Sequence, residues 1–235
     1  MLHQLLTDIM QDKQKVAIFD FCETLVNFQT ADAFVNYVRE RTKSEKMKVK
    51  NTIGIILRKA RIIPILSLIF KRSSLNKRVI LWQLRGFDID QLNQFAEDYY
   101  EDIIRPNFIK PVVNELKSLK NKGWRIVIAS GGYEIYLKYF CSDFNISLKD
   151  LIAVRIGFSN KKCSGTFDGG DRLWDKVEQL VSRFDRNVIS SVAYSDSITD
   201  LPMLQWADEG IVVRREDKES WSRIYKFKEI VWSQE

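Results

Sequence analysis

The second half of this 235-residue sequence alternates short apolar runs with segments of helical periodicity. Apolar runs of this length predict strands that are buried on both faces. The expected strands are 16–19, 124–129, 151–156, 188–194 and 211–213, and the expected helices are 111–120, one from Tyr133, 173–184 and 201–206. Strands that alternate with helices in this way indicate a parallel sheet covered by helices.

The first half differs, because residues 30–107 show helical spacing throughout and contain no convincing strand. No segment rich in Pro, Gly or Ser separates the two patterns, so a second domain would have to be inserted into the first. We therefore expect an α/β fold with a Rossmann-like core formed by 1–29 plus 108–235 and an inserted all-helical segment, 30–107. Three glycines within 159–171 predict a turn or small hairpin.

The positive charge is concentrated in one segment. Residues 39–78 contain thirteen Lys or Arg and two acidic residues, a local net charge of +11. The whole chain carries +6, which leaves −5 for the other 195 residues. Basic character is therefore a property of the inserted segment and not of the predicted sheet.

Two interpretations of the basic segment stay open. Residues 49–70 combine basic side chains with an apolar run, a pattern typical of a helix that lies on an anionic membrane surface. Alternatively, the apolar side packs inside the inserted segment. Nucleic-acid binding is disfavoured, because residues 38–69 contain no aromatic side chain on which a base could stack.

The cysteine pattern and the N-terminus suggest a cytoplasmic protein. Cys22, Cys141 and Cys163 are odd in number and widely spaced, and only one histidine accompanies them, which disfavours disulfides and zinc. The first fifteen residues do not resemble a secretory signal. The most apolar stretch, 62–70, is nine residues long, whereas a membrane-spanning helix needs about 20.

Four polar segments are candidates for a ligand site. In open α/β sheets, ligands bind beyond the carboxyl ends of the strands, and three of the segments follow expected strands there. The segments are Asp20-Phe-Cys-Glu-Thr-Leu25, Ser130-Gly-Gly132, Lys176 early in a helix, and Tyr194-Ser-Asp-Ser-Ile-Thr-Asp-Leu-Pro-Met203. Each alone has a structural explanation as a helix cap, a turn or a solvated charge.

Together the four segments supply the groups for one chemistry. Two of their carboxylates would bind a hard cation, for which Mg²⁺ is the usual choice beside a phosphate. Ser130, the amides that follow it and Lys176 would stabilise charge on a phosphoryl group. Asp20 would form an acyl-phosphate that water then hydrolyses. The combination favours phosphoryl transfer.

The order of these segments resembles the four motifs of the haloacid dehalogenase superfamily over nearly the whole chain. The matching residues are Asp20-Phe-Cys-Glu-Thr-Leu, Ile128-Ala-Ser-Gly-Gly, Lys176 and Ser195-Asp-Ser-Ile-Thr-Asp-Leu-Pro-Met-Leu. The helical insertion after the first motif is similar to the type I cap of the phosphoserine phosphatase branch. The layout also resembles the phosphatidylglycerophosphate phosphatases.

The resemblance implies a role for each metal-site residue. Asp20 would be the nucleophile and, with Asp196, a Mg²⁺ ligand. The main-chain carbonyl of Cys22 would be a third ligand, and Asp200 would support the metal site from behind.

The resemblance also implies how the phosphate is held. Ser130, Lys176 and the amide of Gly131 would contact it. Thr199 stands where phosphoserine phosphatases usually have an Asn that contacts the substrate, which argues against an amino-acid substrate.

Cys22 is the main departure from the family pattern. Phosphatases of this superfamily usually have a second Asp two residues after the nucleophile, which acts as acid and then as base. A thiol, with an ordinary pKa of about 8.5, can donate a proton at neutral pH but suits the two steps poorly. The neighbouring Glu23 is not assigned the role, because adjacent side chains usually point apart.

The expected function is Mg²⁺-dependent hydrolysis of a phosphomonoester through an aspartyl-phosphate. The substrate would be a phosphorylated small metabolite or a lipid head group. The alternative is a catalytically impaired protein that binds a phosphoryl ligand, and its motivation is Cys22.

Overall fold

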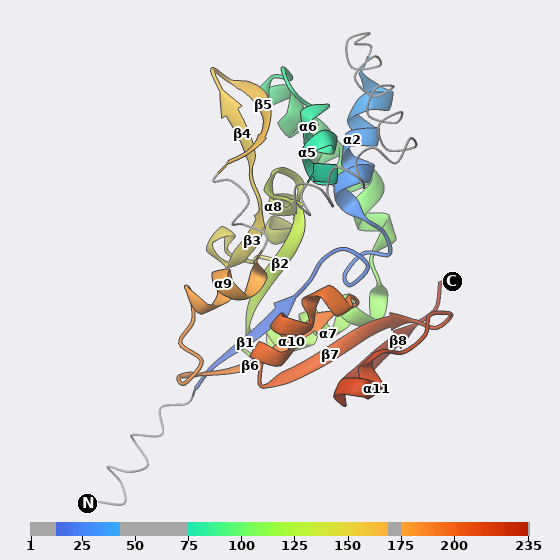
Figure 1. Ribbon diagram of the computed structural model, residues 1–235, viewed down its shortest axis with the longest axis vertical. Coiled ribbons are helices and arrows are strands. Elements are labelled where there is room, and N and C mark those ends of the chain that lie inside the picture. The colour runs from blue at the N-terminus through green and yellow to red at the C-terminus, as the bar shows by residue number, and fades with distance from the viewer. Residues whose placement is uncertain (1–12, 43–74, 169–174, 235) are drawn as a thin grey trace, which may run out of the picture. The chain divides into compact units, whose positions relative to one another are not determined.

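The computed structural model describes residues 13–42, 75–168 and 175–234 (Figure 1). Most of the basic segment, including its apolar run, lies outside the described residues. The chain divides into two compact units. The core unit comprises Met1–Asn27, Phe108–Ala129 and Asp175–Glu235, and the second unit comprises Phe28–Asn107 and Ser130–Trp174. The predicted boundaries, 30 and 107, stay a prediction.

A six-stranded sheet forms the centre of the fold, with strand order β3-β2-β1-β6-β7-β8. The strands are β1 (Gln14–Phe19), β2 (Arg125–Tyr133), β3 (Leu151–Val154), β6 (Ile189–Ser195), β7 (Glu209–Arg215) and β8 (Lys228–Trp232). β1 pairs in parallel with both β2 and β6, and β7 pairs in parallel with both β6 and β8. The predicted α/β class with a parallel sheet is confirmed.

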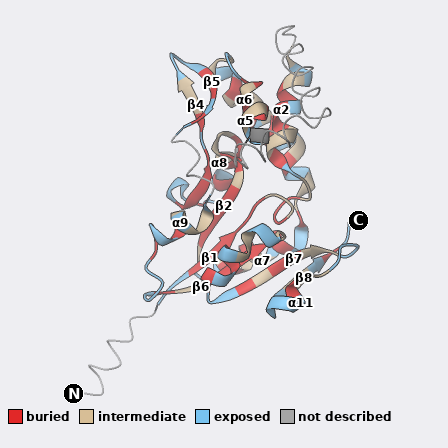
Figure 2. Cartoon of the chain, viewed as in Figure 1, coloured by how far each residue is buried: buried red, intermediate tan, exposed pale blue. Residues whose placement is uncertain are grey.

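The central position of β1 follows from its sequence. All four residues of Val16–Phe19 are fully buried, and most of β1 is coloured as buried in Figure 2. A strand covered on both faces requires such a continuous apolar run. Phe19 stacks on Tyr194 of β6, with ring centroids 4.3 Å apart, so the two central strands are also joined by their side chains. The residues that follow β1 and β6 are thereby placed side by side.

Helices complete the core unit. They are α7 (Lys110–Asn121), α9 (Lys176–Val181), the 3₁₀ turn η5 (Ile198–Asp200), α10 (Leu201–Trp206) and α11 (Ser222–Tyr225). α7 buries Val112, Leu116 and Leu119 at the spacing of three to four residues that one helix face requires.

The second unit is mainly helical in its described part. Its helices are α2 (Thr30–Arg41), α5 (Leu75–Trp82), α6 (Ile89–Tyr99), the π-helical turn η1 (Tyr100–Ile104), the 3₁₀ turn η2 (Arg105–Asn107), α8 (Glu134–Asp143) and the 3₁₀ turn η3 (Leu148–Asp150). β4 (Ile156–Ser159) and β5 (Lys162–Phe167) form an antiparallel hairpin, which confirms the hairpin predicted from the glycines. Aromatic side chains such as Phe34, Tyr99 and Tyr136 fill the interior.

Several predicted boundaries were wrong. The strand expected over 124–129 continues as β2 through Ser130-Gly-Gly to Tyr133. The two glycines predict a turn, but they adopt the extended conformation of the strand. The strand expected over 151–156 ends at Val154, and Ile156 begins β4. The described part of the helix expected over 173–184 is Lys176–Val181. β8 and α11 were not expected, because both are short and mostly exposed or half-exposed.

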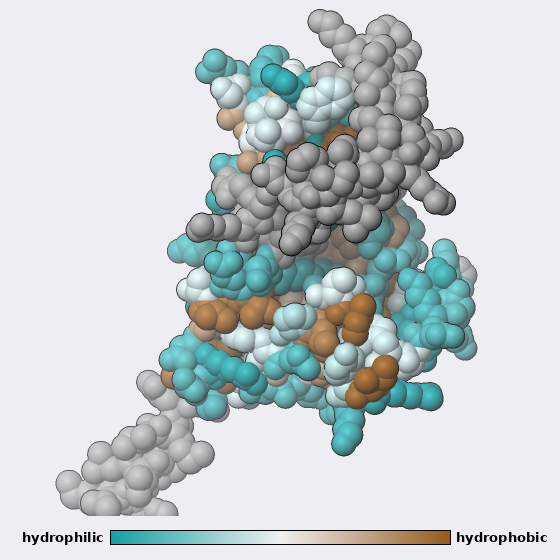
Figure 3. All heavy atoms as spheres, viewed as in Figure 1, coloured by the Kyte–Doolittle hydropathy of each residue, from teal (hydrophilic) through white to brown (hydrophobic). Residues whose placement is uncertain are grey.

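Apolar side chains are also present on the surface. On the face seen in Figure 3, they interrupt a mostly hydrophilic surface. The exposed large apolar residues include Val181, Val188, Ile198, Ile224 and Val231. Single exposed residues of this kind are normal and mark no binding surface. Among the described residues, no helix is long and apolar enough to span a membrane.

Candidate active site

Asp20 is fixed at the carboxyl end of β1 by the backbone of the neighbouring strand. Its amide donates a hydrogen bond of 2.9 Å to the carbonyl of Tyr194 in β6. Ser195 ends β6 at the same edge of the sheet, and Asp196 follows it. The parallel pairing thus brings together two polar segments that are far apart in the sequence, which confirms their predicted convergence in space.

A tight turn follows Asp20. The carbonyl of Phe21 accepts hydrogen bonds from the amides of Leu25 (2.9 Å) and Val26 (3.1 Å). Glu23 takes a left-handed conformation, with φ = 56°, which is uncommon for a residue with a side chain. The chain turns back on itself here, and Thr24 is consequently placed beside Asp20.

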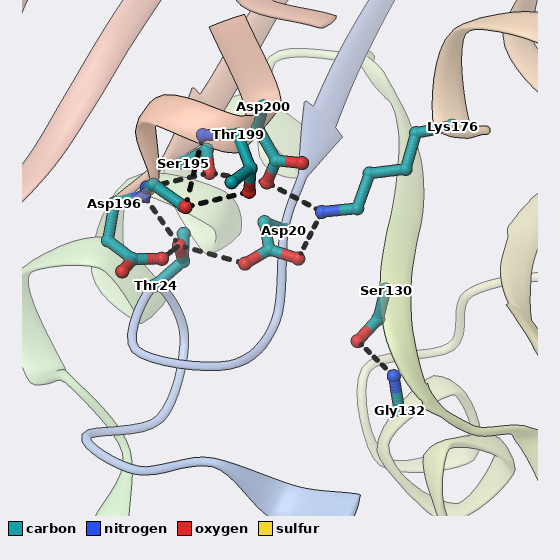
Figure 4. A network of polar contacts seen from close by, with 10 residues as sticks. Asp20, Thr24, Ser130, Gly132, Lys176, Ser195, Asp196, Thr199 and Asp200 are labelled. Atoms are coloured by element: carbon teal, nitrogen blue, oxygen red, sulfur yellow. Dashed lines mark hydrogen bonds and ion pairs between the residues drawn. The ribbon is translucent and has the colours of Figure 1, made fainter. Parts of the chain in front are cut away.

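Thr24 connects the two aspartates and lies 172 residues before Asp196 in the sequence (Figure 4). Its hydroxyl lies 3.3 Å from Oδ2 of Asp20 and 3.1 Å from Oδ1 of Asp196, and it donates toward both. The same oxygen accepts a hydrogen bond of 3.0 Å from the amide of Asp196. Thr24 is fully buried, so this hydroxyl sets the separation of the two carboxylates without competition from bulk water.

Lys176 lies on the other side of Asp20 (Figure 4). Its ammonium is 2.6 Å from Oδ1 of Asp20 and 2.6 Å from Oδ2 of Asp200. Lys176 is the first residue of α9, and the side chain of Asp175 caps that helix by accepting from the amide of Glu178. The cap fixes where the helix begins and therefore where the lysine side chain starts.

Asp200 is held by a second donor. The hydroxyl of Ser195 donates a hydrogen bond of 2.6 Å to Oδ2 of Asp200, the oxygen that also faces Lys176. The amide of Ser197 donates to the Ser195 hydroxyl at 3.2 Å. Asp200 therefore positions the ammonium of Lys176 and is itself positioned by the end of β6.

The charges in this cluster stabilise one another. Burial raises the pKa of Asp20 above its ordinary value of 3.8, the Lys176 ammonium opposes the rise, and Asp200 adds to it. Burial alone would lower the pKa of Lys176, but the two carboxylates raise it above 10.5. Lys176 is therefore charged at neutral pH, and its ammonium favours the ionised form of Asp20 that a nucleophile needs.

Asp196 has a different environment, because among the described residues its carboxylate contacts the Thr24 hydroxyl and no cationic side chain. Burial, the charge of Asp20 and the charge of Glu23 raise the pKa of Asp196 to about 7. Glu23 accepts from Lys218 at 3.2 Å and, with Asp196, lines a cavity of about 70 Å³. Glu23 thus contributes to the field at Asp196, although sequence reasoning gave it no role.

The residues present fit a hard divalent cation. Asp20 and Asp196 are close enough to raise the pKa of Asp196, and both present carboxylate oxygens beside the Thr24 hydroxyl. Within the described ranges, no three His, Cys, Asp or Glu side chains are gathered as a metal site. Mg²⁺ typically uses one or two protein carboxylates and fills its remaining positions with water and substrate phosphate, so two are sufficient.

The predicted phosphate-binding segment belongs to the second unit. Ser130 and Gly131 lie at the end of β2, where Ser130 is buried. The amide of Gly132 donates a hydrogen bond of 3.0 Å to Oγ of Ser130. Because the oxygen accepts this bond, the hydroxyl proton remains to donate to another oxygen atom. The roles of Ser130 and Gly131 stay predictions.

Sequence reasoning missed Thr24 and Ser195. Both carry hydroxyls, which occur at so many turns and caps that the residue type alone gives no signal. Their positions could have suggested a role, because Thr24 lies in the first polar segment and Ser195 directly precedes Asp196. Cys22 is half-buried in the turn after β1. The described residues include all three cysteines, and none forms a disulfide.

The comparison with known families identifies the family of this chain. The model of the haloacid dehalogenase-like hydrolases matches residues 17–205. The chain belongs to this family. The resemblance seen in the sequence is thereby confirmed, and the chain is a hydrolase.

Two relatives of this haloacid dehalogenase-like hydrolase are phosphoserine phosphatases. A phosphoserine phosphatase from Lactococcus lactis is 27% identical over 142 residues, which are 60% of this chain and 62% of that protein. The match thus spans less than two thirds of that relative. A phosphoserine phosphatase from Methanocaldococcus jannaschii is 25% identical over 208 residues, 84% of each chain.

A solved structure shows the same fold at low sequence identity. A Bordetella pertussis Tohama I protein of unknown function has a TM-score of 0.74 at 15% identity, with 93% of this chain and 98% of that chain covered.

Proposed function

We propose that this hydrolase is a Mg²⁺-dependent phosphatase that cleaves a phosphomonoester through an aspartyl-phosphate on Asp20. The observation that supports the proposal most is the position of Asp20 between Lys176 and the Thr24–Asp196 pair. One side of the carboxylate faces a fixed positive charge, and the other faces a second carboxylate. This arrangement suits a nucleophile that must approach an anionic phosphoryl group beside a bound cation.

In the first step, an oxygen of Asp20 attacks phosphorus and the bond from phosphorus to the leaving oxygen breaks. The leaving oxygen takes up a proton and departs as an alcohol. Lys176 and Ser130 would stabilise the charge on the equatorial oxygens during the transfer. Asp200 keeps the Lys176 ammonium in place through its 2.6 Å ion pair.

In the second step, a water molecule attacks phosphorus and the bond to the Asp20 oxygen breaks. The water loses a proton, inorganic phosphate is released, and the carboxylate of Asp20 is restored. The thiol of Cys22 is our candidate for the group that gives and then takes the proton. A group with an ordinary pKa of about 8.5 is mostly protonated at neutral pH, so the thiolate that would accept the proton is scarce and we expect this second step to be slow.

Asp20, Asp196 and the main-chain carbonyl of Cys22 would hold Mg²⁺, with Asp200 behind them. When bound, the ion would supply charge neutralisation between the nucleophile and the phosphate dianion. The closeness of Asp20 and Asp196, which raises the pKa of Asp196, supports this assignment.

The proposed substrate is a phosphorylated small molecule. Two relatives are phosphoserine phosphatases, which makes O-phosphoserine the first compound to test, while Thr199 argues for a different leaving group. A lipid head group and contact with an anionic membrane remain predictions from residues 49–70, all of which lie outside the described part of the chain.

The test is phosphate release from a panel of phosphomonoesters, with and without Mg²⁺. The panel contains O-phosphoserine, sugar phosphates, nucleoside monophosphates and phosphatidylglycerophosphate. We expect Mg²⁺-dependent turnover of at least one compound and its loss in Asp20→Asn. Tight binding of a phosphorylated compound without turnover would instead favour the alternative that Cys22 motivates, a binding protein with an impaired site.

A further inference from the structure

We propose that Tyr136 is a positioning residue that fixes the conformation of the segment Ser130–Tyr133 and ties it to the start of α2. The inference rests on the proposed function, because it takes Ser130 and Gly131 as phosphate-binding groups. All the residues that carry it belong to the second unit. Tyr136 does not contact the substrate in this account and acts through the backbone of the segment.

The hydroxyl of Tyr136 joins two separate parts of the chain. It accepts a hydrogen bond of 2.9 Å from the amide of Tyr133, directly after the two glycines. It also lies 2.8 Å from the hydroxyl of Thr30, the first residue of α2. Tyr136 and Thr30 are both fully buried, and Tyr133 is almost so. These bonds are therefore shielded from water, which would otherwise replace either partner.

Gly132 shows how closely the segment fits this hydroxyl. A Cβ atom added at Gly132 would lie 2.8 Å from the Tyr136 hydroxyl oxygen, 3.1 Å from Oγ1 of Thr30 and 3.2 Å from Oγ of Ser130. The backbone of the segment thus approaches all three hydroxyls within the space that one methyl group would need. The amide of Gly132 donates to Ser130, so the adjoining peptide unit, between Gly131 and Gly132, orients the Ser130 side chain that is proposed to bind phosphate.

The ring of Tyr136 has little freedom to move. It packs between Phe34, with ring centroids 5.2 Å apart, and Tyr99, with centroids 5.3 Å apart. Rings held in this way keep their rotamers, because the interior leaves no room for another arrangement. The hydroxyl is consequently held in one position, and the hydrogen bond from the Tyr133 amide fixes the segment relative to it.

Removal of that hydroxyl would have a specific consequence. In Tyr136→Phe the buried amide of Tyr133 loses its hydrogen bond to this hydroxyl, so the peptide unit between Gly132 and Tyr133 is no longer held by it and can turn. A turn of that peptide displaces the backbone on which Ser130 and Gly131 lie. The expected effect is weaker phosphate binding and not merely lower stability.

Tyr99 offers a matched control. Its hydroxyl donates a hydrogen bond of 2.9 Å to the main-chain carbonyl of Thr30, and its ring is fully buried in the same cluster. Tyr99→Phe removes one buried hydroxyl from the same neighbourhood without touching the Tyr133 amide. A purely structural role would make the two variants alike.

The experiment measures the dissociation constant of inorganic phosphate in the presence of Mg²⁺ by calorimetry, with thermal unfolding of each variant recorded in parallel. We expect Tyr136→Phe to weaken phosphate binding at least fivefold and Tyr99→Phe to change it less than twofold. Thr30→Val, which breaks the Thr30–Tyr136 bond, should weaken binding in the same direction, and Thr30→Ser should restore it. The Thr30 pair decides the question if Tyr136→Phe does not fold.

Two results would overturn the inference alone: phosphate binding that is unchanged in both Tyr136→Phe and Thr30→Val, or weakening of equal size in Tyr136→Phe and Tyr99→Phe. Failure of the unaltered protein to bind phosphate or to hydrolyse any compound of the panel would overturn the proposed function, and the inference with it. The two failures are therefore distinguishable.

Discussion

The ammonium of Lys176 lies 2.6 Å from Oδ1 of Asp20, and both side chains are largely buried. This pair joins the first residue of α9 to the end of the central strand β1, two positions 156 residues apart. Because Asp200 holds the same ammonium, the lysine is fixed by two carboxylates rather than one. The predictions below follow from this cluster.

Lys176→Met should abolish most of the activity and destabilise the protein. The variant leaves Asp20 and Asp200 buried without their cation, a change that typically costs about 3 kcal/mol of unfolding free energy. Phosphate release should fall by at least about a hundredfold, because a fixed charge that stabilises the transferring group is lost.

The matched control is Lys228→Met, which breaks the exposed ion pair of Lys228 with Glu209 at the same sheet. Exposed pairs contribute little, so its activity and urea midpoint should stay close to those of the unaltered protein. Equal losses in the two variants would contradict the account.

Thr24→Val should weaken Mg²⁺ binding, because Thr24 connects Asp20 and Asp196. The valine keeps the shape of the side chain but removes the hydroxyl that donates toward Asp20 and Asp196 and accepts from the Asp196 amide. Loss of a buried partner of this kind costs about 1–3 kcal/mol. We expect a higher Mg²⁺ concentration for half-maximal activity, measured by titration, and recovery in Thr24→Ser. An unchanged Mg²⁺ requirement in Thr24→Val would refute the role given to this hydroxyl.

The raised pKa of Asp196 predicts a pH-dependent stability of the metal-free protein. In the unfolded chain the pKa of this group is its ordinary 3.8, whereas in the folded protein it is about 7. The folded state thus binds the proton more tightly, so the contribution is fully present below about pH 4 and is lost as the pH rises through 7.

Urea unfolding in EDTA should therefore show Asp196→Asn gaining stability relative to the unaltered protein between pH 4 and pH 8. Added Mg²⁺ should stabilise the unaltered protein more at pH 8 than at pH 5, because the metal competes with the proton for the carboxylate. A stability difference that does not change with pH would be inconsistent with the raised pKa of Asp196.

Cys22→Asp should raise the rate of turnover. As a carboxylic acid, an Asp at this position can protonate the leaving oxygen and, as the resulting carboxylate, can accept a proton from water, whereas a thiol is mostly protonated at neutral pH and is seldom available as the base. Steady-state phosphate release at neutral pH measures the effect, with Cys22→Ser as the control that removes the thiol without adding a base. If Cys22→Asp is no faster than the unaltered protein, proton transfer by residue 22 does not limit the rate of turnover.

The sequence predicted the parts of the fold that are buried on both faces. Val16–Phe19 forms a continuous apolar run because β1 is central and covered on both sides. β8 escaped prediction because it is an edge strand, in which charged Lys228 and Glu229 precede Ile230 and Val231 and only Trp232 is buried. Periodicity reports burial, so a partly exposed edge strand gives a weak signal.

The candidate site was predictable to a similar degree. Asp20, Asp196 and Asp200 were identified because parallel strands end at one edge of the sheet. Thr24 and Ser195 were not, since their roles depend on a turn that doubles back at Glu23 and on contacts that no sequence spacing encodes.

Trapping the phosphorylated enzyme tests the central claim most directly. The protein, in molar excess, is mixed with a phosphomonoester that it hydrolyses, and the reaction is quenched in acid within a single turnover. The quenched protein is reduced with borohydride, and the peptide that contains position 20 is analysed by mass spectrometry. The account predicts homoserine, the product of borohydride reduction of an aspartyl-phosphate, at position 20 alone, in an amount that decreases in Cys22→Asp as the second step becomes faster. Active enzyme that releases phosphate in a single turnover without any phosphorylated Asp20 would contradict it.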